Sequence, residues 1–204
     1  MQDFVVEKQN IPLEEKERML SDLKAKCQKC TKCELGKTRH NVVFSDGKAS
    51  AKIILIGEAP GADEDATGTP FVGRAGKLLN TLLDQCGISR AEDLYICNTV
   101  KCRPPENRVP TREEKELCAQ YLQEQIKTLQ PQVIIFCGAT AAKSFLGEKI
   151  KISKIRGQWF SIFGETKAMP IFHPSYLLRN HSEEKDSPRW LTKQDLLTIK
   201  QAIS

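Results

Sequence analysis

Residues 52–61 read KIILIGEAPG, and this stretch decides the fold. Its first part, Lys52–Ile56, is a short apolar run that stops at Gly57. Such a run is typical of a strand buried on both faces of a parallel sheet. The glycines and the proline that follow form a loop at the carboxyl end of the strand, where α/β folds bind their ligands. We therefore expect an α/β fold with a site beside this loop.

The segments on either side of this strand alternate between apolar runs and amphipathic helices. Further strands are predicted at residues 94–97, 132–138 and 168–172, with an edge strand or hairpin arm at 159–163. Helices are predicted at residues 12–26, 78–86, 111–129, 139–147 and 188–203. This alternation predicts one domain over residues 1–204, with three α/β/α layers and a central, mainly parallel four-stranded sheet.

The composition narrows the class and the compartment. Of the 204 residues, 40% are hydrophobic and 28% are charged, which is ordinary for a soluble protein. No apolar run approaches the ~20 residues of a membrane helix, and the amino terminus lacks a basic and then apolar signal segment. We expect a cytoplasmic monomer without a membrane partner. The net charge of +5 permits a nucleic-acid partner, but it fits a slightly basic soluble enzyme equally well.

Eight cysteines are many for a cytosolic chain, where cysteine clusters more often bind metal than form disulfides. Cys30 and Cys33 form a chelating Cys-x2-Cys pair, and Cys102 and Cys118 form a second pair. Two such pairs can hold zinc or an iron–sulfur cluster. Cys27 competes as a ligand, but we discount it because it lies at the end of a predicted helix. The other cysteines are expected to be buried without a ligand: Cys86, Cys97 and Cys137.

Polar side chains follow three of the predicted strands. The carboxamide of Asn98 can both donate and accept hydrogen bonds, which suits the edge of a nucleobase. His173 can donate a hydrogen bond to a developing anion. Phe71 lies between glycine-flanked turns, where its ring could stack on a base. Each of these signals is weak alone, because asparagine is also a common turn residue and a single histidine is more often structural.

Several segments together resemble the family four uracil-DNA glycosylases, the iron–sulfur branch of the uracil-DNA glycosylase superfamily. They occur in the order of the family and span residues 30–179. No single motif decides the match, and the resemblance depends on all of them in register. The matching segments are Cys30-Thr-Lys-Cys33-Glu-Leu-x3-Arg39, Gly57-Glu58-Ala59-Pro60-Gly61, Gly68-Thr-Pro-Phe71-Val-Gly73, Asn98-Thr-Val-Lys-Cys102-Arg-Pro-Pro, Asn107-Arg108-x-Pro110 and His173-Pro174-Ser175.

The resemblance implies a DNA repair hydrolase that flips uracil out of DNA, cleaves its N-glycosidic bond and leaves an abasic site. The implied substrate is uracil-containing DNA, single- or double-stranded. Gly57, Glu58 and Ala59 would line the uracil pocket. Phe71 would stack on the flipped base, Asn98 would read its pyrimidine edge, and His173 would hydrogen-bond the uracil O2 as negative charge develops there.

The resemblance also implies a cofactor and a wedge for the duplex. Cys30, Cys33, Cys102 and Cys118 would hold a 4Fe-4S cluster. The segment Pro174–Arg179, with Tyr176, Leu177 and Leu178, would insert where the base was. Arg103, Arg108 and Arg179 are candidates for phosphate contacts, because each flanks a strand-end loop.

One position departs from the superfamily's best-known branch. That branch has an aspartate, which positions the attacking water, where this sequence has Ala59. The carboxylate role then falls to Glu58 or Glu64, and the sequence leaves both open. The main alternative is a non-catalytic nucleic-acid-binding protein with a structural zinc site, which explains the cysteines but not the polar residues at the strand ends. A nucleotide-handling α/β enzyme ranks third, because the chain has no dinucleotide fingerprint.

Overall fold

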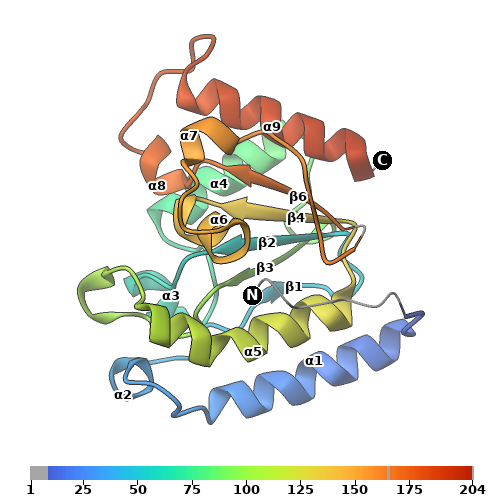
Figure 1. The fold of residues 1–204 in the computed structure, drawn as a ribbon, viewed down its shortest axis with the longest axis vertical. Helices are drawn as coiled ribbons and strands as arrows, with labels where there is room; N and C mark the ends of the chain where they lie inside the picture. Colours follow the sequence, from blue (N-terminus) through green and yellow to red (C-terminus); the bar gives the residue numbers. More distant parts are fainter. Residues whose placement is uncertain (1–8, 165, 204) are drawn as a thin grey trace.

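The structure, a computed structural model, describes residues 9–164 and 166–203 (Figure 1). A sheet with the strand order β1-β3-β2-β4-β6-β5 lies at its centre. Its four middle strands are mutually parallel and match the predicted ones: β2 (Ile53–Gly57), β3 (Leu94–Asn98), β4 (Val133–Cys137) and β6 (Thr166–Ile171). Every residue of β2, β3 and β4 is buried, as expected for a parallel sheet covered on both faces.

The prediction of four strands is wrong, because the sheet described has six. Strand β1 (Asp46–Gly47) pairs antiparallel with β3 at one edge. Strand β5 (Phe160–Ile162) pairs antiparallel with β6 at the other edge, where the sequence suggested an edge strand or hairpin arm. A strand of two residues such as β1 has no period to read, so its sequence carries no signal.

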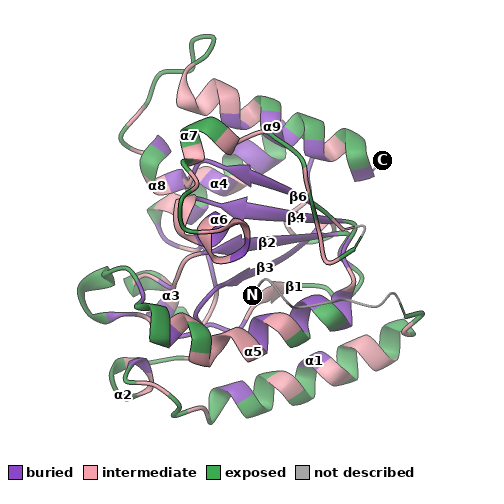
Figure 2. Ribbon diagram, in the orientation of Figure 1, coloured by how far each residue is buried: buried purple, intermediate pink, exposed green. Residues whose placement is uncertain are grey.

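Helices cover both faces of the sheet, which confirms the predicted three layers (Figures 1 and 2). They are α1 (Leu13–Gln28), α2 (Leu35–Thr38), α3 (Ala62–Thr67), α4 (Arg74–Gln85), α5 (Arg112–Leu129), α6 (Ala139–Leu146), α7 (Ile152–Ile155), α8 (Pro174–Leu177) and α9 (Pro188–Ile203), with a 3-10 turn at Pro105–Asn107.

Alternate residues of each strand point to opposite faces, and each face has its own core. Ile53 and Leu55 of β2 belong to a cluster with apolar side chains of α4 and α9. Ile54 and Ile56 belong to a second cluster with side chains of α5 and α6. Helix α1 packs outside α5, so this side of the sheet has a further layer (Figure 1).

Side-chain caps fix where two of these helices begin. The Thr111 hydroxyl accepts a hydrogen bond from the Glu114 amide, and the Glu114 carboxylate accepts one from the Thr111 amide, as the predicted capping box requires. Helix α3 lies in a segment that the sequence presented as a loop. Its first turn is capped by the Glu64 carboxylate, which accepts from the Gly61 amide.

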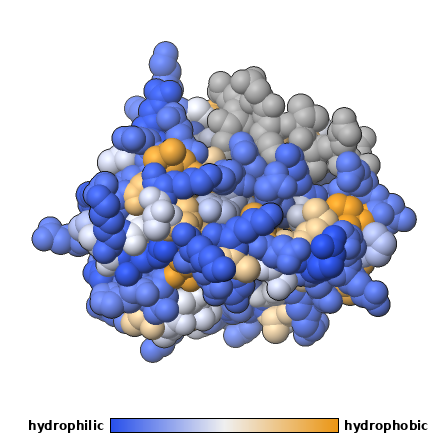
Figure 3. All heavy atoms as spheres, turned by 90° about the horizontal axis from the view of Figure 1, so that it is seen from below, coloured by the Kyte–Doolittle hydropathy of each residue, from blue (hydrophilic) through white to orange (hydrophobic). Residues whose placement is uncertain are grey.

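The outer surface on the α1 side is largely hydrophilic, with only scattered hydrophobic residues (Figure 3). Within residues 9–164 and 166–203, none of the helices is both long and apolar enough to span a bilayer.

Candidate active site

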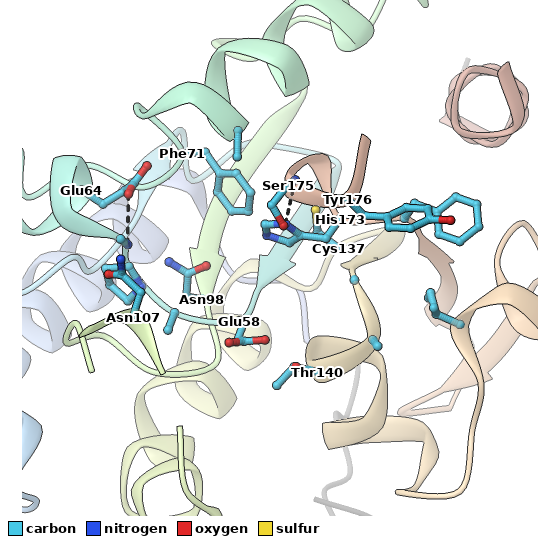
Figure 4. A pocket seen from close by; sticks show the side chains of 18 of the residues that line it. Glu58, Glu64, Phe71, Asn98, Asn107, Cys137, Thr140, His173, Ser175 and Tyr176 are labelled. Carbon is cyan, nitrogen blue, oxygen red and sulfur yellow. Dashed lines mark hydrogen bonds between the residues drawn. The ribbon is translucent and has the colours of Figure 1, made fainter. Parts of the chain in front are cut away.

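A pocket of about 710 Å3 opens at the carboxyl ends of the parallel strands. Glu58, Phe71, Asn98 and His173 all line it, although they lie far apart in the chain (Figure 4). Ala59 lines it as well, so five of the six predicted substrate-binding residues share one cavity, at the edge of the sheet where the topology places ligands. Gly57 is not among the lining residues and lies beside Asn98 instead.

The pairing of β2 with β3 places Gly57 directly beside Asn98. Asn98 is only 2% exposed, and its carboxamide makes no hydrogen bond with the described residues, so its donor and acceptor face the pocket (Figure 4). A Cβ atom on Gly57 would collide with Oδ1 of Asn98 and would lie 2.7 Å from Cζ of Phe71. Only glycine at this position leaves room for both side chains.

Phe71 is held in an unusual backbone conformation, with φ at +53°. A non-glycine residue in this left-handed region costs about 1 kcal/mol or more, so its surroundings must hold it there. The Arg90 guanidinium donates to the carbonyls of Phe71 and Pro70 at 3.1 and 2.7 Å. Gly76 allows the close approach, since a Cβ there would collide with the Phe71 carbonyl. The ring lies 5.9 Å from that of His173, centroid to centroid.

The two candidate carboxylates have different surroundings. Both oxygens of Glu64 accept main-chain hydrogen bonds, one from Gly61 at 3.0 Å and the other from Val72 and Gly73 at 2.9 Å each. The half-buried carboxylate of Glu58 makes no hydrogen bond with the described residues, although its main-chain oxygen accepts from the Thr99 hydroxyl at 2.6 Å. Glu64 therefore holds the loop, and Glu58 is available to a ligand.

His173 precedes α8 as its N-cap, and its ring is oriented by the residues that follow. The Ser175 amide donates to Nδ1 at 3.1 Å, so Nδ1 is an acceptor and the proton of the neutral ring sits on Nε2. The Ser175 hydroxyl lies 2.7 Å from the same nitrogen. Burial lowers the pKa of His173 to about 4, which keeps the ring neutral near pH 7.

The predicted wedge includes a residue that cannot serve. Leu177 has 0% exposure and belongs to the core beside α4 and α9, so it is not a wedge residue. Leu177 is the last residue of the short helix α8, and its side chain points into the core rather than toward the pocket. Tyr176 is 38% exposed, and its ring lies 5.1 Å from that of Phe172.

The three arginines proposed for phosphate contacts also differ. Arg108 forms two hydrogen bonds to the Glu114 carboxylate, at 2.9 and 2.7 Å, so its charge is already paired. Arg103 donates to the Asn107 side chain at 2.8 Å. Arg179 is exposed on the wall of the pocket.

A second, smaller pocket lies among cysteines. It is lined by all four predicted ligands and also by Cys27. Cys27 therefore stays a candidate ligand, although it lies at the end of α1. Burial raises the pKa of the Cys118 thiol to about 11 and of Cys27 to about 12, and the Lys101 ammonium opposes both shifts. Across the described residues, no group of three or more His, Cys, Asp or Glu side chains is arranged to hold a metal ion.

Two N–H donors point at these sulfur atoms. The Arg39 guanidinium donates to Cys102 Sγ at 3.2 Å and to the Cys30 carbonyl at 2.8 Å, which joins the two cysteine pairs. The Lys101 amide lies 3.4 Å from Cys118 Sγ. Arg39 and Lys101 both belong to segments that carry the family resemblance, but no role was predicted for either, because their contacts with the cysteines form only when the fold brings the two pairs together.

The pocket also includes residues that the sequence did not single out. Gly138 follows β4 with φ at +95°, and its missing side chain makes room for His173, since a Cβ there would lie 2.8 Å from the Cβ of His173. Thr140, in the first turn of α6, lines the pocket as well (Figure 4). The rule that ligands bind at strand ends could have identified both, because β4 ends immediately before them.

The environment of His173 predicts a neutral ring over the usual pH range. Because its pKa in the folded chain is lowered from 6.5 to about 4, nitrogen NMR of the imidazole should show the neutral Nε2–H form from about pH 8 to about pH 5. The contribution to stability is fully present above pH 6.5 and is lost as the pH falls toward 4. A protonated ring at about pH 6 would contradict this assignment.

Comparisons with known proteins agree with the arrangement of the site. Residues 44–197 match the model of the Uracil DNA glycosylase superfamily. The type-4 uracil-DNA glycosylase of Thermotoga maritima is 49% identical over 83% of this chain and 88% of its own. Its counterparts from Archaeoglobus fulgidus and Saccharolobus solfataricus are 43% and 41% identical, over 78% and 87% of this chain and 83% of each relative. This chain therefore belongs to the type-4 family of the uracil DNA glycosylase superfamily.

Proposed function

We propose that this chain is a DNA repair hydrolase that cleaves the N-glycosidic bond of uracil in DNA, releases free uracil and leaves an abasic site for base excision repair. The observation that carries the proposal is the buried carboxamide of Asn98, which lines the pocket with Phe71 and His173 and makes no hydrogen bond with the described residues. We expect one domain that acts on DNA as a cytoplasmic monomer.

Asn98 supplies the selectivity for uracil. The pyrimidine edge of uracil offers a carbonyl O4 and an N3 hydrogen, whereas cytosine offers an amino group and a bare N3. A carboxamide whose NH2 meets O4 and whose oxygen meets N3–H pairs with uracil twice, and it opposes donor with donor for cytosine. Unpaired buried polar groups discriminate strongly, by 10⁴-fold or more in the best cases. Phe71 holds the base by stacking, and Gly57 leaves room for both side chains.

His173 stabilises the departing base. Bond cleavage places negative charge on the uracil ring and positive character on the sugar. A neutral Nε2–H directed at O2 stabilises that anion, and one well-placed donor is worth about 3–4 kcal/mol in the transition state. The lowered pKa keeps His173 a neutral donor near pH 7, so its hydrogen bond does not depend on pH in that range.

Glu58 holds the attacking water and balances the charge of the sugar, because it is the carboxylate of the pair that is not already bonded to main-chain amides. Glu64 is a positioning residue, whose three main-chain hydrogen bonds fix the loop before Phe71 and the turn after it. On the rim, Tyr176 and Leu178 are the exposed and half-buried residues that support the DNA at the vacated position, and Arg179 contacts phosphate.

Cys30, Cys33, Cys102 and Cys118 hold a 4Fe-4S cluster in this proposal. The donor set supports it: the pocket is lined by thiols and basic side chains without a carboxylate, and Arg39 donates to one of the sulfur atoms. When bound, the cluster supplies a covalent tie between the segment after α1 and the loop after Asn98. A zinc ion on the same thiols is the alternative that metal analysis distinguishes.

The direct test is incubation with an oligonucleotide that contains one uracil, followed by alkali, which breaks the strand at abasic sites. We expect cleavage at the uracil position and release of the free base, with an otherwise identical thymine oligonucleotide left intact. Binding of the uracil oligonucleotide without cleavage would favour the non-catalytic alternative.

Asn98→Asp tests the reading of the base. The change removes the donor for O4 and supplies an acceptor for the cytosine amino group. We expect the variant to lose much of its uracil activity and to gain measurable activity on cytosine in weakly paired positions. If it cleaves uracil at the parent rate and ignores cytosine, Asn98 does not read the base.

Glu58→Gln and Glu64→Gln separate the two carboxylates. Loss of the water-holding carboxylate should reduce the single-turnover rate by about 10²-fold or more with an unchanged melting temperature. Loss of charge-assisted hydrogen bonds at Glu64 should instead lower the melting temperature, because it should reduce the free energy of unfolding by about 1.5–3 kcal/mol. The reverse pattern would show that the roles are exchanged.

Cys27, Cys30 and Cys33 lie close together in the sequence, and two of them give a matched pair of variants. These are Cys27→Ala and Cys33→Ala, in protein purified without oxygen. We expect iron content and absorbance near ~400 nm to survive the first change and to be lost after the second. Iron loss in Cys27→Ala would show that Cys27 is a ligand and that the proposed ligand set is wrong. Zinc without iron in the parent chain would exclude the cluster.

A further inference from the structure

Lys101 is a completely buried lysine, with 0% exposure, that lines the cysteine pocket and also contacts the main chain of Asn98. Its Nζ donates to the main-chain oxygen of Asn98 at 2.9 Å and to Oε1 of Gln125 at 2.6 Å. Gln125 is itself fixed, since its amide donates to the Phe44 carbonyl at 3.2 Å and to the Tyr95 hydroxyl at 3.1 Å. The ammonium therefore sits in a rigid network that ends at the proposed base-reading residue.

The charge of Lys101 has no carboxylate partner among the residues described. An ammonium removed from water costs several kcal/mol unless negative charge compensates it. The groups around it that can become negative are thiols, because Lys101 lines the pocket that the cysteines form. Its own amide lies 3.4 Å from Cys118 Sγ, and the next residue in the chain is Cys102.

We propose that Lys101 is a positioning residue that couples the cysteine pocket to recognition of the base. Its ammonium faces the negative charge of the ligated thiolates on one side and fixes the main chain of Asn98 on the other. Because Asn98 ends β3, a shift of its carbonyl also turns its carboxamide in the pocket. This inference rests on the proposed function, since it assumes both the ligated cysteines and the reading of uracil by Asn98.

The variant Lys101→Met tests this coupling, because it keeps most of the apolar stem and removes the charge and the donors. We expect it to retain its iron, since none of the four ligands changes. The single-turnover rate on uracil should fall by about tenfold to a hundredfold, because small displacements of positioned groups have effects of this size. The preference for uracil over cytosine should decrease, and the cluster's reduction potential should become more negative, because a neighbouring positive charge is lost.

Lys16→Met is the matched control. Lys16 also donates to a main-chain oxygen, that of Leu129 at 2.8 Å, but at the far end of α5. This variant should match the parent in rate, base preference and potential. Lys101→Arg is measured in parallel, since it keeps the charge but places its donors differently. It should keep a potential near that of the parent while still cleaving uracil more slowly.

The outcomes separate this inference from the proposed function. An inactive parent chain contradicts the proposed function, and the coupling fails with it. An active parent together with a folded Lys101→Met that keeps the parent rate and base preference contradicts the coupling alone. Loss of iron or of folding in both Lys101 variants would make Lys101 a purely structural residue and would also overturn the inference.

Discussion

The parallel pairing of β2 with β3 is the contact on which the site depends. It places the last residue of each strand side by side, so Gly57 and Asn98 meet at the carboxyl edge of the sheet. The absence of a side chain on Gly57 lets the carboxamide of Asn98 and the ring of Phe71 occupy the same corner. A shift of the pairing by one residue would turn Asn98 to the opposite face of the sheet. Strand register, rather than any loop, therefore sets the position of the residue that is proposed to read the base.

The loops around this edge are fixed by side chains that bond to the main chain. Glu64 accepts from three amides, Arg90 donates to two carbonyls, and the amide of Ser175 orients the imidazole of His173. Each such bond restrains a loop that has no strand partner. Groups fixed before the ligand arrives need no reorganisation when charge develops, which is the condition for electrostatic stabilisation of a transition state. The strained backbone of Phe71 is tolerated because two of these bonds hold it.

The sequence predicted the parts of the molecule that depend on local patterns. The four parallel strands follow from short apolar runs, and the start of α5 follows from its capping box. Burial within a short helix and charge pairing across loops are not local. This is why the predicted wedge included the buried Leu177, and why the candidates for phosphate contacts included Arg108, which is paired with Glu114. Glu58 and Glu64 could not be separated in the sequence, because their difference lies in bonds to amides up to nine residues away.

The loop of residues 99–111 is the segment that the proposed cluster would restrain. This segment connects β3 to α5, is rich in proline, and includes Glu106 and Asn107 with φ at +55° and +56°. It contains only one short 3-10 turn, so it cannot restrain itself through regular main-chain bonds. Its ties are to other segments: Cys102 to the cysteine pocket, and Arg108 to α5. The proposed cross-link at Cys102 would hold the loop immediately after Asn98, and it would thereby restrain the strand end whose side chain is proposed to read the base.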